Sequence, residues 1–325
     1  MRVVWLREFG PPDVLEVGDA PDPAPGPGQV VVDVVAAGVN FVETQVRAGR
    51  FGADGTDLPT IPGNEVGGVV SAVGAGVDPG LVGRRVVTST GGSGGYAERV
   101  AVSADGVIPV PDGLDLRDAT ALFTQGRTAV ALTKAAAIQP GDRVLVEAAG
   151  GGVGSLLVQL ARTAGAGMVV AAAGGERKLA VARDLGADVL VDYRDPAWAD
   201  RVREATDGAG VDVVFDGVGG DVGRTAFELL APRGRFVLFG MASGAPTQAT
   251  LAEVLSRGLT VVGFGGGRQI RSPEHARALA AEALAEAAAG RLRPVIGQTF
   301  PLERAADAHA AIESRETVGK TLLVP

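Results

Sequence analysis

Short apolar runs alternate with Ala-rich helical stretches over the second half of the chain, and this alternation constrains the fold most strongly. The runs begin near Arg143, Met168, Asp188, Val211, Arg235 and Leu259, at steps of about 20 to 25 residues. Each step has room for one strand and one crossover helix. Runs such as Val211 to Phe215 are apolar at almost every position, which is typical of parallel strands buried on both faces. The alternation therefore predicts a doubly wound parallel sheet.

About the first 110 residues consist of short extended runs that are separated by Gly and Pro clusters such as Pro21 to Gly28. The predicted strands are Val3 to Arg7, Gln29 to Ala36, Gly68 to Val73, Arg85 to Ser89 and Gly95 to Val102. One helix is predicted from Asn40 to Ala48, with Asn40 as its N-cap. This pattern predicts a partly open β-barrel domain.

The residues after Gly267 are too few for a third core. They predict helices over Pro273 to Ala289 and Leu302 to Ser314, and strands over Val295 to Phe300 and Lys320 to Val324. We expect this segment to return to the first domain. The predicted domains are thus residues 1–120, residues 121–265, and a return over residues 266–325.

The absence of cysteine and the presence of only two histidines exclude several chemistries. Thiolate catalysis, disulfides and Cys-ligated zinc are impossible, and His275 and His309 are too few for a His-rich metal site. A net charge of −8 disfavours a nucleic-acid partner. The sequence from Met1 to Glu8 has no apolar leader, and no long apolar segment follows. We therefore expect a cytoplasmic, soluble protein without nucleic-acid or membrane partners.

A glycine-rich turn follows the first strand of the predicted sheet. Arg143 to Glu147 leads into Ala148-Ala149-Gly150-Gly151-Gly152-Val153-Gly154, and a helix from Ser155 to Ala164 follows. In this context, glycines let backbone N–H groups approach a pyrophosphate at the positive end of the helix. The turn predicts a dinucleotide site, and the alternative is a tight packing turn without a ligand.

The end of the second strand, near Ala171 to Ala173, lacks the acidic residue that is typical of NAD sites. Gly174-Gly175-Glu176-Arg177-Lys178 follows, at the start of the next helix. Cations at this end of a helix oppose its dipole unless an anion lies beside them. A ribose 2′-phosphate would be that anion, which predicts NADPH with Gly174, Arg177 and Lys178 at its phosphate. The alternative is a solvated helix face.

Several motifs extend over almost the whole chain. They are Gly38-Val39-Asn40-Phe41-Val42-Glu43-Thr44 with Arg47 and Gly49, Pro59 to Gly74, Gly95-Tyr96-Ala97-Glu98, Gln125-Gly126-Arg127-Thr128-Ala129, Gln139-Pro140-Gly141-Asp142, Ala148 to Gly154, Leu185-Gly186-Ala187-Asp188 and Gly319-Lys320. With these motifs the chain resembles the zinc-independent medium-chain dehydrogenases/reductases, and among them the NADPH:quinone oxidoreductase (zeta-crystallin-like) branch. The resemblance implies an α/β protein with a GroES-like β-barrel catalytic domain beside a Rossmann domain that binds NADPH.

The resemblance also implies which residues contact the coenzyme. They are Asn40, Thr128, Gly151, Gly152 and Val153, with Gly154 of the same loop, together with Lys178, Tyr193, Lys320 and the backbone of Phe264. Tyr193 follows the third strand of the sheet and would support the adenosine phosphate with Lys178. The alternative for Tyr193 is a surface aromatic.

A homodimer is predicted from the last strand of the sheet. Leu259 to Phe264 is an apolar run with no charge between Arg257 and Arg268. An exposed edge of this kind is normally paired. The resemblance likewise implies that two Rossmann sheets pair edge to edge.

The chain departs from its zinc-binding relatives at both expected ligands. These relatives keep a Cys in the turn that is Gly38 to Phe41 here, and a Gly-His-Glu where this chain has Gly63-Asn64-Glu65. Both ligands are replaced, so we expect no metal and a structural role for Glu65.

The chain also departs from the quinone reductases. They often have an Asp, and a Tyr two residues later, at the positions of Glu43 and Gln45, and a second Tyr at the position of Phe51. Two phenol donors are therefore absent. The sequence leaves the physiological acceptor open.

Together these features predict a reductase that transfers a hydride from NADPH to a quinone or an enone. Asn40 and Gln45 are the predicted catalytic side chains, because amides can bind the acceptor oxygen on which charge develops, while solvent supplies the proton. One alternative is an enal or enoyl-thioester reductase on the same fold. The other is an NADPH-binding sensor or crystallin-like protein without significant turnover.

Overall fold

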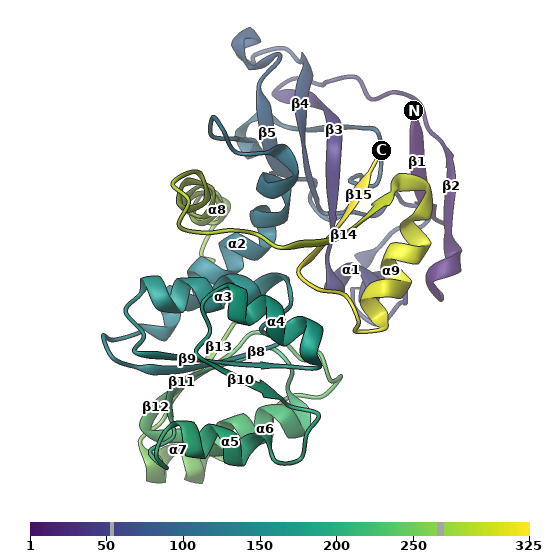
Figure 1. The fold of residues 1–325 in the computed structure, drawn as a ribbon. Helices are drawn as coiled ribbons and strands as arrows, with labels where there is room; N and C mark the ends of the chain where they lie inside the picture. Colours follow the sequence, from purple (N-terminus) through teal and green to yellow (C-terminus); the bar gives the residue numbers. More distant parts are fainter. Residues whose placement is uncertain (53–54, 265–269) are drawn as a thin grey trace. The chain divides into compact units, whose positions relative to one another are not determined.

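The computed structural model describes residues 1–52, 55–264 and 270–325 (Figure 1). The chain divides into two compact units. The first unit contains Met1–Thr124, Ala283–Ala288 and Pro294–Pro325, and the second contains Gln125–Glu282 and Ala289–Arg293. The predicted domain boundary between residues 265 and 266 lies outside the described residues. None of the helices in the described ranges is long and apolar enough to cross a membrane.

The first unit is built on a seven-stranded sheet with the order β14-β15-β3-β4-β5-β7, in which β6 also pairs with β3. Its strands are β3 (Gln29–Val39), β4 (Glu65–Val73), β5 (Arg85–Ser89), β6 (Arg99–Ser103), β7 (Ile108–Pro109), β14 (Ile296–Pro301) and β15 (Lys320–Val324). A separate antiparallel pair is formed by β1 (Arg2–Leu6) and β2 (Leu15–Asp19). The predicted GroES-like barrel is confirmed.

The pairing of the last strand with β3 brings the two ends of the sequence together. Figure 1 shows β15 beside β3. The pairing is antiparallel, with Thr321 opposite Val39 and Leu323 opposite Ala37. Lys320, the first residue of β15, therefore lies next to Asn40, the first residue after β3. This register positions the buried cluster described below.

The helices that lie wholly in the first unit are short. They are α1 (Phe41–Arg47), α9 (Ala305–Glu313) and the single 3-10 turns η1 (Pro12–Val14), η3 (Pro79–Leu81), η4 (Ala104–Gly106) and η5 (Leu302–Arg304). The longer helices α2 (Leu116–Ala136) and α8 (Pro273–Ala288) contribute residues to both units. The core of the unit joins valines of β3, such as Val30 and Val32, to Tyr96 and to Leu302 and Ala308 near the C-terminus. The C-terminal segment thus completes the first core.

The second unit is a six-stranded parallel sheet with the order β10-β9-β8-β11-β12-β13. Its strands are β8 (Arg143–Glu147), β9 (Met168–Ala173), β10 (Val189–Asp192), β11 (Val211–Asp216), β12 (Leu230–Leu238) and β13 (Thr260–Gly263). Its helices are α3 (Gly152–Thr163), α4 (Glu176–Asp184), α5 (Trp198–Ala205), α6 (Gly220–Glu228) and α7 (Leu251–Arg257). The predicted doubly wound sheet is confirmed.

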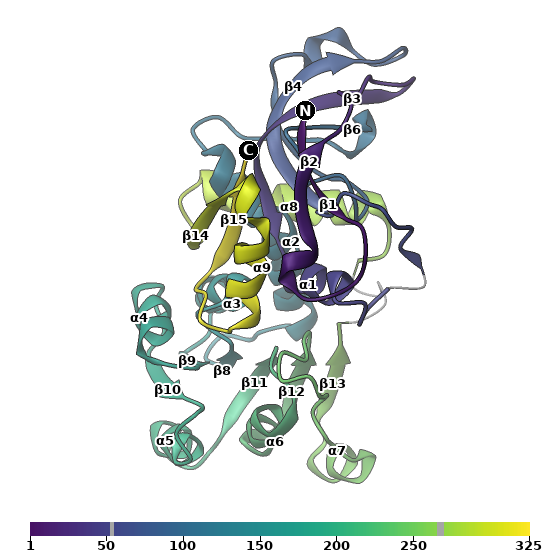
Figure 2. The same cartoon turned by 90° about the vertical axis from the view of Figure 1, so that its right-hand side faces the viewer.

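The helices of the second unit cover both faces of its sheet. Figures 1 and 2 show α3 and α4 on one face, and α5, α6 and α7 on the other. The order of the strands reverses between β8 and β11, which is the point where open α/β sheets bind their ligands. The sheet is buried because valines and alanines occupy its strands, among them Val144, Val170 and Val214.

Three predictions for the first unit were wrong in detail. The predicted strand Gly95 to Val102 begins only at Arg99, because the N–H groups of Gly95 and Tyr96 bind the carbonyls of Gly63 and Pro62 in a loop. The strands β2 and β7 were not predicted, since β2 is largely exposed and β7 has two residues. The predicted helix Leu302 to Ser314 begins with the separate turn η5.

Candidate functional site

The first unit buries an ion pair where β3, β4 and β15 meet. Lys320 Nζ forms this pair with Glu65 Oε1 and also donates to Asn40 Oδ1 at 2.8 Å. Glu65 further accepts from Asn40 Nδ2 at 3.1 Å and from the N–H of Thr124 at 3.0 Å. The side chains of Lys320 and Glu65 are 3% and 0% exposed. A buried pair is tolerated only when its remaining polar atoms are also bonded, as they are here.

Gly38 makes room for this ion pair. It lies opposite Glu65 in the β3–β4 ladder. A Cβ atom on Gly38 would lie 2.1 Å from Glu65 Oε1, a distance that no side chain could accept. The glycine therefore allows a carboxylate to lie flat against the end of β3.

Glu43, in the first turn of α1, is a second buried carboxylate beside the pair. It accepts from the N–H groups of Asn40 at 2.8 Å and Asn64 at 2.9 Å, and from the Tyr96 hydroxyl at 2.9 Å. Burial raises the pKa of the Glu43 carboxyl, while Lys320 and the N–H of Asn40 act in the opposite direction. These donors hold the carboxyl group in one orientation.

Tyr96 connects Glu43 to a histidine from the C-terminal segment. Its hydroxyl lies 2.9 Å from His309 Nε2, and the two rings meet edge to face at 5.7 Å. Since the hydroxyl proton is donated to Glu43, His309 Nε2–H donates to the tyrosine oxygen. Burial, with a smaller effect of Arg47, lowers the pKa of His309 to about 3. His309 is therefore neutral at physiological pH and positions Tyr96 rather than exchanging protons.

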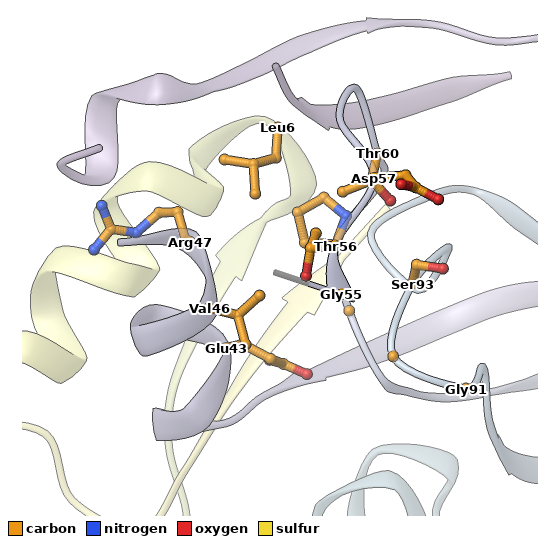
Figure 3. Close-up of a pocket in the computed structure, with 13 residues that line it drawn as sticks. Leu6, Glu43, Val46, Arg47, Gly55, Thr56, Asp57, Thr60, Gly91 and Ser93 are labelled. Atoms are coloured by element: carbon orange, nitrogen blue, oxygen red, sulfur yellow. The ribbon is translucent and has the colours of Figure 1, made fainter. Parts of the chain in front are cut away.

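A pocket of about 310 Å³ lies in the first unit beside α1. Figure 3 shows Glu43 and Val46 reaching from α1 toward the segment that carries Thr56 and Asp57. The wall across from them includes Gly91, Gly92 and Ser93, which offer backbone groups and a hydroxyl. The Arg47 guanidinium is directed to Gly10 O and Glu313, so its charge is compensated.

The two predicted catalytic residues lie near this pocket in the sequence but are not among its described lining residues. The Asn40 amide is used inside the cluster, by Glu65 and Lys320. Gln45 is partly buried, and its Nε2 donates to Thr44 Oγ1 at 3.0 Å.

In the second unit, the glycine-rich turn packs so tightly that side chains are excluded. A Cβ on Gly154 would lie 2.2 Å from the carbonyl oxygen of Ala148, and one on Gly150 would lie 2.6 Å from Lys178 Cβ. The first brings α3 close to β8, and the second brings the start of α4 against the turn. Gly151 precedes α3, and Gly152, Val153 and Gly154 form its first turn, whose N–H groups have no carbonyl partners within a helix. The turn thus has the features of a phosphate cradle.

The start of α4 lies under side chains that follow β10. A Cβ on Gly174 would lie 3.2 Å from the Tyr193 ring, and one on Gly175 would lie 2.7 Å from the Arg194 guanidinium. Asp192 accepts from the N–H of Gly175 at 3.1 Å and pairs with Arg194 at 2.7 Å. Hydrogen bonding to Arg194 lowers the pKa of Asp192 despite its partial burial. The guanidinium therefore offsets the charge of the Asp192 carboxylate at this turn.

Sequence reasoning missed Arg194 and Asp192. Because β10 pairs with β9, the residues that end the two strands lie side by side, with Asp192 opposite Ala173. The signal that could have identified them is the run Asp192-Tyr193-Arg194 directly after the third strand of the sheet.

The remaining predicted site residues are distributed over both units. Thr128 is partly buried in α2, and Phe264 follows β13, where its N–H donates to Leu238 O at 2.7 Å. The structure brings Lys178 against the glycine turn and Tyr193 against Gly174. It brings Asn40 and Lys320 together in the first unit.

At the positions where zinc ligands would be expected, this chain forms a hydrogen bond and an ion pair instead. Asn64 Oδ1 accepts from the Ser89 hydroxyl at 3.0 Å, and Glu65 is bound by Lys320. Within the part of the chain that the structure describes, no three His, Cys, Asp or Glu side chains form a group that could hold a metal ion.

Comparison with known proteins agrees with this geometry. The family model described as alcohol dehydrogenase GroES-like domain matches residues 26–112, and the model described as zinc-binding dehydrogenase matches residues 152–284. A quinone oxidoreductase of Pseudomonas aeruginosa is 37% identical over 324 residues, which cover 99% of each chain. A 2-haloacrylate reductase of a Burkholderia species is 36% identical over 98% of each chain.

A solved structure shows the same similarity. The quinone oxidoreductase of Escherichia coli, in complex with NADPH, superposes with a TM-score of 0.90 at 31% identity, over 100% of both chains. The match extends over both units, and the relatives share full length with this chain. The chain therefore belongs to the quinone oxidoreductase family of the medium-chain dehydrogenases/reductases.

Proposed function

We propose that this oxidoreductase uses NADPH to reduce a quinone or another neutral acceptor with a conjugated carbonyl. The observation that carries the proposal is the turn before α4, where Tyr193 and Arg194 lie over two glycines and Lys178 packs on the phosphate cradle. The end of β9 carries no acidic residue that would repel a 2′-phosphate. The relative from Escherichia coli was solved with this coenzyme.

The residues present fit NADPH. The N–H groups of Gly152, Val153 and Gly154 at the start of α3 would hold the pyrophosphate. Gly151, whose own N–H donates to Ala148 O at 2.8 Å, stays a proposed contact of the coenzyme in the same turn. Gly174, Arg177, Lys178 and Tyr193 would hold the 2′-phosphate, with Arg194 as an additional cation. Thr128, Phe264, Asn40 and Lys320 stay proposed contacts of the remaining coenzyme. When bound, NADPH supplies the hydride that reduces the acceptor.

We propose that Asn40 and Gln45 position the substrate from beside the pocket, Asn40 acting through Glu43, which lines the pocket and accepts from the Asn40 N–H and Nδ2 groups. The Asn40 amide is held by Lys320 at its oxygen and by Glu65 at its nitrogen, so its orientation is set before any ligand binds. An amide has no useful pKa, which makes its contribution one of positioning. Gln45 lies on α1, the helix that Asn40 precedes as N-cap, and its side chain is partly buried.

The pocket beside α1 is our proposed acceptor site, and its charge favours a neutral molecule. Glu43 and Asp57 both line it, and the nearby Arg47 is bound to Glu313. Two carboxylates in the wall would repel an acceptor that carries its own carboxylate.

The first prediction concerns the acceptor. In assays of NADPH oxidation, neutral quinones and enones should be reduced with a kcat/KM at least about tenfold higher than that of 2-haloacrylate, because of the two wall carboxylates. Asp57→Asn should reduce this difference in kcat/KM between neutral acceptors and 2-haloacrylate. Asp105→Asn, at an exposed turn, should leave the difference unchanged. A preference for the carboxylate would refute the neutral-acceptor proposal. Turnover confined to enals or acyl thioesters, or no turnover at all, would favour one of the alternative functions.

The second prediction concerns the coenzyme. Lys178→Ala should weaken NADPH binding by at least about tenfold and leave NADH binding nearly unchanged, because a charge-assisted bond to phosphate contributes about 1.5 to 3 kcal/mol. Arg194→Gln should also weaken NADPH binding more than NADH binding, but by a smaller factor than Lys178→Ala. Arg183→Gln, at the far end of α4, serves as the control. The dissociation constants of both coenzymes are measured by protein fluorescence. Equal losses of affinity for NADPH and NADH would exclude the phosphate site.

We further propose that catalysis needs no metal ion. The turn Gly38 to Phe41 has no cysteine and Gly63-Asn64-Glu65 has no histidine, so both ligands of the zinc-binding relatives are replaced, and the Lys320 ammonium binds Glu65. A cation placed at this carboxylate would compete with that ammonium.

The third prediction follows from this pairing. Prolonged chelation should leave both turnover and the melting temperature unchanged, because Lys320 already supplies the positive charge at Glu65. Metal analysis of the purified protein should find less than stoichiometric zinc. Loss of activity on chelation, with recovery on adding zinc, would disprove this proposal.

We also propose that two copies pair through the edge of the second unit's sheet. β13 ends the described sheet, and Val261 on it is 44% exposed. On the neighbouring helix α7, Leu251 and Leu255 are 87% and 83% exposed. An apolar sheet edge with exposed leucines is typical of an interface. The cytoplasmic location stays a prediction from the sequence.

The fourth prediction concerns this edge. Light scattering should give about twice the monomer mass of 32.7 kDa at micromolar concentration. Val261→Lys should shift the mass to that of the monomer, because a lysine at the edge blocks strand pairing. Val82→Lys, at a 50% exposed valine of the first unit, should leave the mass unchanged. A monomeric wild type would refute the dimer.

A further inference from the structure

Two carboxyl groups are completely buried at the ends of adjacent strands in the second unit. Glu147 is the last residue of β8 and Asp216 is the last residue of β11. The two strands pair in parallel, with Phe215 opposite Val146. The two acids are the next residues on their strands, so they lie side by side at the same edge of the sheet. Both side chains are 0% exposed. They lie at the point where the strand order reverses.

The two acids have different hydrogen-bond partners. Asp216 Oδ1 accepts from the N–H groups of Val218 at 3.1 Å and Gly219 at 2.7 Å, and Oδ2 accepts from the Thr247 hydroxyl. Glu147 Oε2 accepts from the N–H of Val218 at 3.0 Å. Glu147 Oε1 is buried and finds no donor among the described residues. Asp216 is thus suited to the charged form, and Glu147 is not.

A proton on Glu147 Oε1 resolves this imbalance. A buried carboxylate oxygen without a donor costs about 1 to 3 kcal/mol or more, whereas a protonated one becomes a donor itself. Asp216 is the acceptor that faces it. Burial, followed by the charge of Asp216 and a hydrogen bond between the two side chains, raises the pKa of Glu147 well above its ordinary value.

The pair connects two loops at this edge of the sheet. The turn over residues 217–219 joins β11 to α6, and the loop over residues 239–250 joins β12 to α7. The two are tied by bonds from Ser243 N–H to Val218 O at 2.8 Å and from Gly220 N–H to Ala245 O at 3.0 Å. The backbone oxygen of Asp216 accepts from Phe239 N–H, and its carboxylate accepts from the Thr247 hydroxyl.

We propose that Glu147 and Asp216 share one proton, and that this singly charged pair positions the 217–219 turn and the 239–250 loop for coenzyme binding. The positioning step rests on the proposed function, because it assumes that the coenzyme lies where the strand order reverses. The shared proton itself does not depend on it. Loss of the proton would put a second negative charge beneath loops that receive a polyanionic coenzyme, and the two carboxylates would then repel each other and the coenzyme.

The surroundings of Glu147 supply little to compensate such a charge. On β11, Asp216 faces it, and the N–H groups of Gly217 and Val218 favour its ionised form. After β10, the Tyr193 phenol is within electrostatic reach, and its pKa is raised by burial and further by Glu147. Strand β9 presents the uncharged Ala172 opposite Glu147. Lys178 packs on Gly150 of the turn that follows.

The sign of the pH effect follows from the raised pKa. An unfolded glutamate loses its proton near its ordinary pKa of about 4.3, whereas the buried one keeps it. The stability from the neutral form is thus fully present below that value and is lost as the pH rises through the folded pKa. Glu147→Gln mimics the protonated acid: its oxygen can accept from Val218 and its amide can donate to Asp216, at every pH.

The fifth prediction is tested by urea unfolding of the coenzyme-free protein between pH 5 and pH 9. The ratio of the unfolding constant of the wild type to that of Glu147→Gln should rise with pH, by up to about tenfold per pH unit within the titration window. Glu204→Gln, at an exposed acid on α5, should follow the wild type. A ratio that does not change with pH would overturn the shared proton. If Glu147→Gln does not fold, infrared spectra of the wild type decide: a protonated-carboxyl band at pH 7 that persists in Glu43→Gln supports the proposal, and its absence overturns it.

A second measurement tests the positioning role. The dissociation constant of NADPH should rise severalfold more steeply with pH in the wild type than in Glu147→Gln, and titration of the coenzyme's own phosphate cancels in this comparison. Equal pH dependence, with NADPH bound by both proteins, would overturn the positioning role. Failure of both proteins to bind NADPH at any pH would instead refute the proposed function, while the unfolding experiment still tests the shared proton.

Discussion

The ion pair between Glu65 and Lys320 is the constraint on which the first unit depends. Burying an isolated ammonium or carboxylate costs several kcal/mol, and removing one partner of a buried pair typically costs about 3 to 5 kcal/mol. The C-terminal strand must therefore dock with its first residue against the start of β4. This docking sets the register of β15 on β3 and closes the core around Leu302 and Ala308.

The same pair organises the site around it. Asn40 is oriented by the two charges, and its N–H in turn donates to Glu43 in the first turn of α1. Glu43 is held by Tyr96, and Tyr96 by the neutral His309. The chain thus has an ammonium at the glutamate that accompanies zinc in related dehydrogenases. The Lys320 ammonium and a fixed set of hydrogen bonds occupy this position.

In the second unit, close packing and electrostatic interactions act at separate places. Gly150 and Gly154 permit close packing between the turn, α3 and α4, and this packing aligns the N–H groups that suit a phosphate. At the start of α4, where we propose a second anion site, Arg194 pairs with Asp192. Below both lies an acid pair, Glu147 and Asp216, whose charge state is linked to the loops at the edge of the sheet.

The fold and part of the site could be predicted because their signals are local in the sequence. The apolar alternation from Arg143 onward, the glycine turn and the helix after Asn40 depend on short-range sterics and burial, and each formed close to its predicted position. The weakly patterned strands β2 and β7 carry no such signal. Likewise, the cations Arg177 and Lys178 were visible in the sequence because they begin a helix.

The tertiary structure alone decided which distant residues meet. Lys320 and Glu65 are 255 positions apart, and Tyr96 and His309 are 213 apart. Arg194 reaches the turn before α4 only because β10 pairs with β9, and Glu147 meets Asp216 only because β11 crosses to the other side of β8. The sequence by itself determined the elements and the absence of thiol chemistry, since these follow from residue type and spacing. The charge state of each buried group depends on neighbours and desolvation, which exist only once the chain has folded.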